Sequence, residues 1–359
     1  MTQQQETTLH YPLDSTLPGP AETIEVAPGV KWLRMALPFA LDHINLWLLR
    51  DRQEDGHGQL REGWTVVDCC VNRAEAREQW EQVFANGLEG LPILRVIVTH
   101  MHPDHIGLAG WLCRRWQAPL WISATDYNVA RVAMADKDSF GGESGADFYQ
   151  LHGQRDETFL GHVRGRGNYY SSLVSPLPTA YHRLIDGLSL DIGGRSWQCI
   201  AGYGHAPEHM ALHCPELNLL ISGDMVLPRI SANVSVHATE PEANPLQLFM
   251  DSLQRYLALP ADTYVLPSHG KPFTGLHQRI RQLLEHHQER LADIMQAAGS
   301  QALCAADTLP ILFKRQLDVH QMTFAMGEAL AHLHYLWFGK QLQRRMDAQG
   351  VLRFSLSSS

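Results

Sequence analysis

Histidine and aspartate residues in one short segment carry the strongest chemical signal of the sequence. Residues 99–105 spell THMHPDH and directly follow an apolar run. Four side chains that can bind a metal ion lie within six residues: His100, His102, Asp104 and His105. Imidazole suits zinc, iron and related ions, and a carboxylate adds a harder ligand. Burying so many polar groups without a partner would be unfavourable, so the segment predicts a metal site.

The spacing within this segment indicates two ions rather than one. His100 and His102 are two residues apart, so in an extended backbone their side chains can point to one side. Pro103 then turns the chain, and Asp104 and His105 can address a second ion beside the first. Since zinc prefers about four ligands, four residues cannot complete two sites.

Three later residues can supply the missing ligands. His205, Asp224 and His269 each follow an apolar run of the strand type. Loops at strand ends are where an α/β scaffold usually builds its site. A lone residue of this kind is most often structural, but three of them in order after the first cluster strengthen the prediction of a metal centre.

The elements that must position these residues alternate between strands and helices. The expected strands are Val30–Met35, Asn45–Leu49, Trp64–Asp68, Leu94–Thr99, Leu120–Ile122, Trp197–Ala201, Met210–Cys214, Leu217–Ser222 and Tyr264–Leu266. The expected helices in the same part of the chain are Glu75–Asn86 and Gly107–Gln117. This alternation predicts an α/β layered catalytic domain over residues 1–275.

Two stretches depart from this rhythm. Residues 136–180 are polar and rich in Gly, which is typical of a lid or binding loop and also of a solvated connector. After Gly275 the apolar spacing becomes helical, so we expect a helical C-terminal domain over residues 276–359. Within it we expect a helix over Thr323–Leu336 and a short strand over Val351–Leu356.

With these residues the sequence resembles the metallo-β-lactamase superfamily. The superfamily's H-x-H-x-D-H motif and its later His, Asp and His match the seven residues above, and its early Asp after a strand matches Asp68. The resemblance covers roughly residues 25–275 and implies a four-layer αβ/βα sandwich with the site at one edge of two sheets. A weaker resemblance, in residues 327–333 and the final helix–turn–strand, implies a winged-helix-like tail.

The resemblance also implies an arrangement of ligands. One metal would take His100, His102 and His205, the other Asp104, His105 and His269, and Asp224 would bridge them with a hydroxide. True β-lactamases typically have Cys in place of Asp224, so the similarity is to the glyoxalase II, lactonase and nuclease branches. Two divalent ions are therefore expected, with zinc preferred and iron or manganese as alternatives.

Residues beside the ligands suggest how a reaction could proceed. We predict catalytic roles for Asp104, for Asp68 in orienting a ligand and for His209 as a proton donor. His209 and Tyr203 flank His205 and are the nearest candidates for that donor. Supporting a neighbouring ligand and packing are the alternative roles for His209 and Tyr203. Residues 42–45, which follow an early strand, could approach the cavity.

The preferred function is hydrolysis of a thioester, ester or lactone of a small anionic substrate. Arg155, Arg164 and Arg166 in the polar stretch fit an anionic ligand, although surface ion pairs are the alternative. A ribonuclease or other phosphodiesterase is the second hypothesis, supported by the tail. A non-catalytic sensor or effector is the third, and the complete ligand set argues against it.

Composition limits the surroundings in which the protein works. The net charge of −9 argues against a large nucleic-acid footprint, so a nucleic-acid partner is the weaker expectation than a small molecule. No secretory signal and no membrane-spanning run is evident, and the six cysteines form no C-x-x-C pair. We therefore expect a cytoplasmic protein with reduced thiols, with a homodimer as one option for its assembly.

Overall fold

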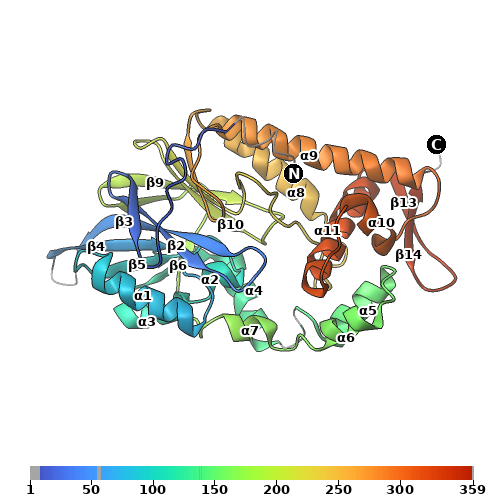
Figure 1. Ribbon diagram of the computed structural model, residues 1–359, viewed down its shortest axis with the longest axis horizontal. Coiled ribbons are helices and arrows are strands. Elements are labelled where there is room, and N and C mark those ends of the chain that lie inside the picture. Colours follow the sequence, from blue (N-terminus) through green and yellow to red (C-terminus); the bar gives the residue numbers. More distant parts are fainter. Residues whose placement is uncertain (1–8, 55–57, 137, 139, 358–359) are drawn as a thin grey trace.

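Two β-sheets form the core of the N-terminal part of the protein, on the left in Figure 1. The computed structural model describes residues 9–54, 58–136, 138 and 140–357. The first sheet holds seven strands in chain order: β1 (Thr23–Ala27), β2 (Val30–Ala36), β3 (His43–Glu54), β4 (Leu60–Val67), β5 (Ile93–Ile97), β6 (Leu120–Ser123) and β7 (His182–Leu184). Strands β1 to β4 pair antiparallel, and β4 to β7 pair parallel, as helical connections between them require.

The second sheet holds five strands in the order β12-β11-β10-β9-β8. Their bounds are β8 (Ser189–Ile192), β9 (Arg195–Gly202), β10 (His209–Cys214), β11 (Leu219–Gly223) and β12 (Tyr264–Pro267). Only β11 and β12 pair parallel, with Leu220 opposite Val265. Because β11 and β12 run in the same direction, the loops that follow both strands lie at the same edge of the sheet.

Apolar side chains from both sheets meet between them. Trp32 and Trp47 of the first sheet pack with Trp197 and Leu212 of the second in one buried cluster. The rings of Trp32 and Trp47 stack at 6.2 Å and are inaccessible to solvent. Burying a large side chain of this kind contributes on the order of 1.5–3 kcal/mol, so the inter-sheet layer is a major source of stability.

Helices cover the outer face of each sheet and complete four layers. On the first sheet these are α1 (Ala74–Asn86), α2 (Pro103–Ile106), α3 (Ala109–Trp116) and α4 (Ala124–Ala135), and near the second they are α8 (Pro245–Arg255) and α9 (Leu276–Ala298). A 3₁₀ turn over Tyr256–Ala258 follows α8. Helix α1 shows the principle, since Ala76, Trp80 and Val83 recur at helical spacing and are its buried residues. The predicted α/β fold with two sheets is confirmed.

The polar stretch of residues 136–180 is more regular than its composition suggested. It contains α5 (Gly142–Leu151), α6 (Glu157–Arg164) and α7 (Tyr169–Leu173). Phe148, Phe159 and Val163 of this stretch enter the same core as the C-terminal helices. These few apolar anchors stabilise short helices through tertiary packing, which the local sequence alone does not reveal. Residues 137 and 139 of the stretch, like the first eight residues, lie outside the described part.

The C-terminal part is helical and ends in a two-stranded hairpin. After α9 come α10 (Ala305–Leu312), α11 (Val319–Phe338), β13 (Leu342–Met346) and β14 (Leu352–Leu356). The expected helix of this region lies within α11, and the expected short strand coincides with β14 apart from its first residue. Ile280 of α9 and Leu330 of α11 share one hydrophobic cluster with Leu220 and Val265 of the second sheet. The C-terminal helices therefore share a hydrophobic core with the sheet that carries part of the site.

Two further observations concern thiols and membranes. All six cysteines are buried and free. Within the described ranges, no helix is both long and apolar enough to cross a lipid bilayer.

Candidate metal centre

The predicted ligands converge on one edge of the two sheets. Residues 100–105 follow β5 and continue into α2, whose first residue is Pro103. His205, Asp224 and His269 follow β9, β11 and β12, respectively. Strand ends from both sheets therefore bring together residues that are up to 169 positions apart in the sequence.

The first group consists of three histidine nitrogens. His100 Nε2 lies 2.8 Å from His102 Nδ1 and 3.3 Å from His205 Nε2, and the two latter atoms are 3.2 Å apart. Ligand atoms about 2.0–2.1 Å from a tetrahedral ion lie roughly 3.3 Å from one another. The three nitrogens can therefore surround one ion.

The second group combines two histidines and a carboxylate. Asp104 Oδ2 lies 3.4 Å from His269 Nε2 and 3.7 Å from His105 Nε2. The three residues form one of the groupings with ligand atoms close enough to hold a common ion. This second group has a harder donor than the first, since it includes an oxygen ligand.

Asp224 faces both groups with different oxygens. Its Oδ2 lies 3.3 Å from His205 Nε2, while its Oδ1 lies 3.5 Å from both His105 Nε2 and His269 Nε2. Asp224 Oδ1 and His105 Nε2 are buried and have no hydrogen-bond partner among the described protein atoms. Unsatisfied buried polar atoms are rare in proteins, so these two atoms fit the inner surface of an ion site. The seven residues together fit a dinuclear centre bridged by Asp224.

Hydrogen bonds on the outer side fix the orientation of the ligand rings. Asp68 Oδ2 accepts from His105 Nδ1 at 2.8 Å and also accepts from the Thr99 hydroxyl. The His205 Nδ1 lies 2.7 Å from the Asn233 carbonyl, and the His269 Nδ1 lies 2.7 Å from the His43 carbonyl. The three bonds made by ligand rings each use Nδ1–H as the donor. In the neutral imidazole this leaves Nε2 unprotonated and directed toward the centre.

The charges of the buried groups are suited to metal binding. Burial and neighbouring histidines lower the pKa of His100 well below its usual value and that of His102 to about 3. Burial acts to raise the pKa of Asp224, but His269 and His105 outweigh it and lower that pKa. Burial likewise acts to lower the pKa of His105, but nearby carboxylates, Asp68 first, raise it well above its usual value. Neutral imidazoles and ionised carboxylates are the forms that bind metals, and a cation at the centre would favour the neutral form of His105.

Backbone conformations that most side chains avoid occur at three turns of the centre. Asp68 has φ 64°, Gly204 has φ 96° and Gly223 has φ 53°. A Cβ atom at Gly223 would lie 2.0 Å from His209 Nε2, and one at Gly204 would lie 2.2 Å from the Pro245 carbonyl oxygen. The two glycines are therefore required both by their backbone conformation and by the close approach of neighbouring groups.

His209 lies beside the centre but holds a backbone group. It is fully buried, and its Nε2 accepts from the Asp224 backbone N–H at 3.2 Å. This nitrogen is therefore not the one that carries a proton, and its neighbour Nδ1 is buried. The geometry assigns His209 to positioning Asp224 rather than to the predicted role of proton donor.

Two further residues position the loops of the centre, and only the second lies in a segment that the sequence singled out. Asp126, near the start of α4, accepts from the backbone N–H groups of Met101 and Glu208 at 2.8 and 2.6 Å. It thereby ties the first histidine loop to the loop after His205. Asn45 Nδ2 donates to the carbonyls of Pro267 and Gly270, which flank His269. Residues 42–45 therefore do reach the metal centre, as the sequence suggested.

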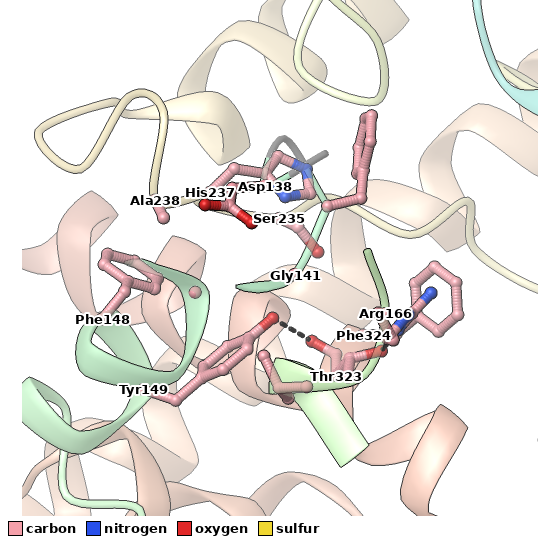
Figure 2. A pocket seen from close by; sticks show the side chains of 13 residues that line it. Asp138, Gly141, Phe148, Tyr149, Arg166, Ser235, His237, Ala238, Thr323 and Phe324 are labelled. Carbon is pink, nitrogen blue, oxygen red and sulfur yellow. Dashed lines mark hydrogen bonds between the residues drawn. The ribbon is translucent and has the colours of Figure 1, made fainter. Parts of the chain in front are cut away.

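The four candidate substrate residues lie in different surroundings. Arg155 donates to the Gln150 carbonyl, and Arg164 pairs with Glu143 and Glu157 at the exposed surface. Tyr203 is partly exposed and interacts with charged groups at Glu208, Asp186 and Arg255. Arg166 differs from these, because it lines a pocket beside α11 (Figure 2). The structure thus separates Arg166 from the two other arginines of the insertion.

Comparisons with known proteins agree with this geometry. The model of the metallo-β-lactamase superfamily matches residues 59–269, and that of the metallo-β-lactamase-like C-terminal domain matches residues 291–357. The crystal structure of a β-lactamase domain protein from Burkholderia ambifaria is 49% identical, with a TM-score of 0.92, over 99% of this chain and 100% of that one. A metallo-β-lactamase family protein from Thermus thermophilus is 28% identical, with a TM-score of 0.74, over 92% and 100% of the two chains.

A curated relative is similar to this chain in sequence. The Bacillus subtilis (strain 168) protein named "Probable metallo-hydrolase YqjP" is 23% identical over 311 residues, which are 85% of this chain and 91% of the relative. The superfamily model spans the segment from β4 to the last ligand, His269, and therefore includes every residue of the two ligand groups. The chain belongs to the metallo-β-lactamase superfamily, and its site has the ligand groups of a metallo-hydrolase of that superfamily.

Proposed function

We propose that the protein is a dinuclear metal-dependent hydrolase that acts on a thioester, ester or lactone of a small anionic substrate. The observation that carries the proposal is Asp224, whose two carboxylate oxygens face two separate ligand groups. A histidine-rich donor set favours zinc, and the oxygen-containing second group also suits iron or manganese. When bound, two such ions lower the pKa of water and polarise the carbonyl oxygen under attack.

The protein's own residues hold the reacting centre in place. Asp68 fixes the ring of His105, while the Asn233 and His43 carbonyls fix His205 and His269. Asp104 is more accessible than the bridging carboxylate, with 19% of its side chain exposed against 10% for Asp224. We propose that Asp104, besides serving as a ligand of the second group, accepts a proton from the water that attacks the substrate.

The position of His209 supports one class of leaving group over others. Its Nε2 accepts from a backbone N–H, so His209 does not supply a proton from that atom. A thiolate leaves without protonation, whereas an alkoxide or amine needs an acid. This supports thioesters as the first substrate class to test.

The C-terminal part supports a finer description of the fold. Three helices followed by an antiparallel hairpin occur in the order typical of a winged helix, and we propose that relationship here. Lys340, Arg344 and Arg345 form a small basic cluster in the sequence of this part, and Arg344 pairs with Glu242 within the protein. This arrangement gives no added support to a nucleic-acid substrate.

A substrate panel with parallel metal analysis tests the proposal. The purified protein, loaded with zinc, iron or manganese, is assayed with a thioester, a lactone, a phosphodiester and an RNA oligonucleotide. We expect about two metal equivalents per chain and hydrolysis of the thioester or lactone above the phosphodiester. A content that never exceeds one equivalent contradicts the dinuclear centre. Faster turnover of the RNA contradicts the substrate class.

A further inference from the structure

A small pocket lies between the insertion and helix α11. It encloses a volume of about 70 Å³, and its walls come from the loop before α5, from α5, α6 and α11, and from residues 235–238. Figure 2 shows Arg166 and Thr323 on one side and Asp138 and His237 on the other. A space of this size suits one ring or short chain of a ligand rather than a complete large ligand.

One wall of the pocket is connected to the first histidine loop. The ring of Phe140 stacks on Tyr170 at 5.4 Å. The Tyr170 hydroxyl donates to the backbone carbonyl of Met101, which lies between His100 and His102. The pocket wall is therefore separated from the first ligand group by a single layer of side chains.

Two other walls continue this aromatic layer. The guanidinium carbon of Arg166 lies 4.1 Å from the ring centre of Tyr169, which begins α7 beside Tyr170. On the opposite side, the ring centres of His237 and Phe140 are 6.0 Å apart. A ligand in the pocket can thus extend along this layer toward the first ligand group.

Arg166 is the cation of this pocket. Its Nη1 donates to the Thr323 hydroxyl at 3.0 Å, and no ion pair joins it to a carboxylate within the described ranges. By contrast, Arg164 on the neighbouring turn is held by two glutamates. A guanidinium without a carboxylate partner is suited to bind an anionic ligand through several N–H donors.

The remaining charge in the pocket distinguishes between anions. Asp138 also lines it, and its Oδ1 would be 2.1 Å from a Cβ at Gly142, so it lies beside the first residue of α5. The positive end of the helix partly offsets this carboxylate but does not cancel it. A single negative charge is therefore accepted more readily than the double charge of a phosphate monoester.

Aromatic side chains supply the rest of the lining. Phe324 of α11 is 44% exposed, although it is a large apolar residue, and it lines the pocket with Phe140 and Phe148. Aromatic side chains beside one cation are the composition expected of a site for an apolar carboxylate.

We propose that this pocket binds a carboxylate-bearing apolar portion of the substrate, with Arg166 paired to the carboxylate and Phe324 packed on the carbon skeleton. The carboxylate lies on a part of the substrate remote from the bond that is cleaved. The inference rests on the proposed function only in placing that bond at the metal centre. Helix α11 thereby takes part in substrate selection.

Direct binding tests the pocket independently of turnover. The metal-loaded protein is titrated with 3-phenylpropionate, its neutral amide and phenyl phosphate by calorimetry. Arg166→Gln should raise the Kd of 3-phenylpropionate about tenfold and leave the amide unchanged, because a charged hydrogen bond is lost. Phe324→Ala should weaken the acid and the amide alike. Arg164→Gln, the matched surface control, should change neither.

Several outcomes would contradict the proposed binding role of the pocket. Equal binding of 3-phenylpropionate to wild type and Arg166→Gln would place the acid elsewhere, for instance on the metal ions. An equal loss in Arg164→Gln would indicate a general charge effect. Tighter binding of phenyl phosphate than of the acid would contradict the preference for carboxylates. Circular dichroism of each variant establishes that the fold is intact.

Kinetics separate this inference from the proposed function. With a succinyl thioester, Arg166→Gln should raise KM about tenfold with kcat little changed, since the contact is the same in ground and transition states. A butyryl thioester should show no such effect. If thioester hydrolysis is insensitive to the Arg166 substitution, the proposed binding role of the pocket is refuted and the proposed hydrolase function stands. If binding depends on Arg166 but no substrate of the panel is hydrolysed, the proposed hydrolase function is refuted and the proposed binding role of the pocket stands.

Discussion

The three carboxylates of the metal centre differ in what surrounds them, and these surroundings separate their roles. Asp224 contacts histidines of both ligand groups, Asp104 contacts only the second group, and Asp68 lies behind His105. A carboxylate between two groups affects both, whereas one behind a ring acts through the ring's orientation. Substitutions of these residues should therefore differ in metal content as well as in activity.

Asp224→Ala should lose metal from both groups at once. Removing both oxygens takes a ligand from each group and leaves three histidines on one side, so metal content should fall well below two equivalents and hydrolysis should be lost. Metal analysis and circular dichroism check this. Asp251→Ala, at an exposed position on α8 where the side chain bonds Gln247, is the control. Retention of two equivalents and full turnover would refute the bridging role.

Asp68→Asn should weaken metal binding through the orientation of the His105 ring, because Asp68 is not itself a predicted ligand. Asn tolerates the left-handed backbone at this position, φ 64°, so the turn is preserved. The amide no longer offers a charged acceptor to His105 Nδ1, and loss of such a partner typically lowers metal affinity or activity about 10–100-fold. Competition with a metal chelator measures the affinity, and Asp251→Asn is the control. A metal affinity equal to wild type would show that Thr99 and the backbone hold the ring without Asp68.

At the residue scale the sequence revealed the ligands because their chemistry is carried by side chains at characteristic spacing. It did not reveal the partners of His205 and His269, since these are the backbone carbonyls of Asn233 and His43. Any residue has such a carbonyl, so no residue type marks the position. The carboxylate of Asp126 escaped notice because a single Asp near a helix start is common in proteins.

At the element scale, tight turns after strands decide where the ligands point. Gly223→Ala places a Cβ 2.0 Å from His209 Nε2 and forces a left-handed backbone on alanine. We expect a loss of more than about 2 kcal/mol in unfolding free energy, since strain alone contributes about 1–2 kcal/mol. Thermal denaturation and metal content measure it.

Gly350→Ala provides the matched comparison for this turn. Gly350 has φ 74°, but a Cβ there would have no neighbour within 4 Å. It should therefore show the backbone strain without the clash and should keep its metal. Equal destabilisation of the two variants, with metal retained in both, would show that the approach to His209 is unimportant.

Helix α9 holds the segment that orients His205. Arg279 Nε and Nη2 donate to the carbonyls of Leu227 and Ile230, and His287 Nε2 lies 3.0 Å from the Ser231 hydroxyl. Arg279→Met leaves the buried Leu227 carbonyl and the partly buried Ile230 carbonyl without donors and should destabilise the protein by about 2–4 kcal/mol. Urea denaturation checks this, with Arg290→Met, a partner of Asp293 on the same helix, as the control. A loss below about 1 kcal/mol would refute the anchoring role.

The elements that the sequence predicted best were apolar runs that fill most of a strand, such as those of β2 and β10. The helices of the insertion were missed because α5 has mostly small and polar residues and α6 is only eight residues long. Their stability comes from Phe148 and Phe159 in a core shared with α11. Contacts between such distant segments are not encoded in local periodicity.

At the scale of the whole molecule, one hydrophobic cluster joins the second sheet to the C-terminal helices. Leu220, Val265, Ile280 and Leu330 belong to it together. A shared core of this kind predicts that both parts unfold cooperatively. Hydrogen exchange should show α11 and β10 opening at the same urea concentration, and tryptophan fluorescence should give one transition. Earlier exchange of α11, followed by a second fluorescence transition, would show independent domains.

The wide sequence separation of the ligands has a consequence for biosynthesis. The first histidine group is complete once His205 has been made, but the second requires His269, 64 residues later. At about 5–20 residues per second, this interval lasts about 3–13 s on the ribosome. During it the nascent chain contains every histidine of the first group but lacks His269 of the second. The supply of the correct metal while the protein is being translated is therefore a point at which its final composition can be decided.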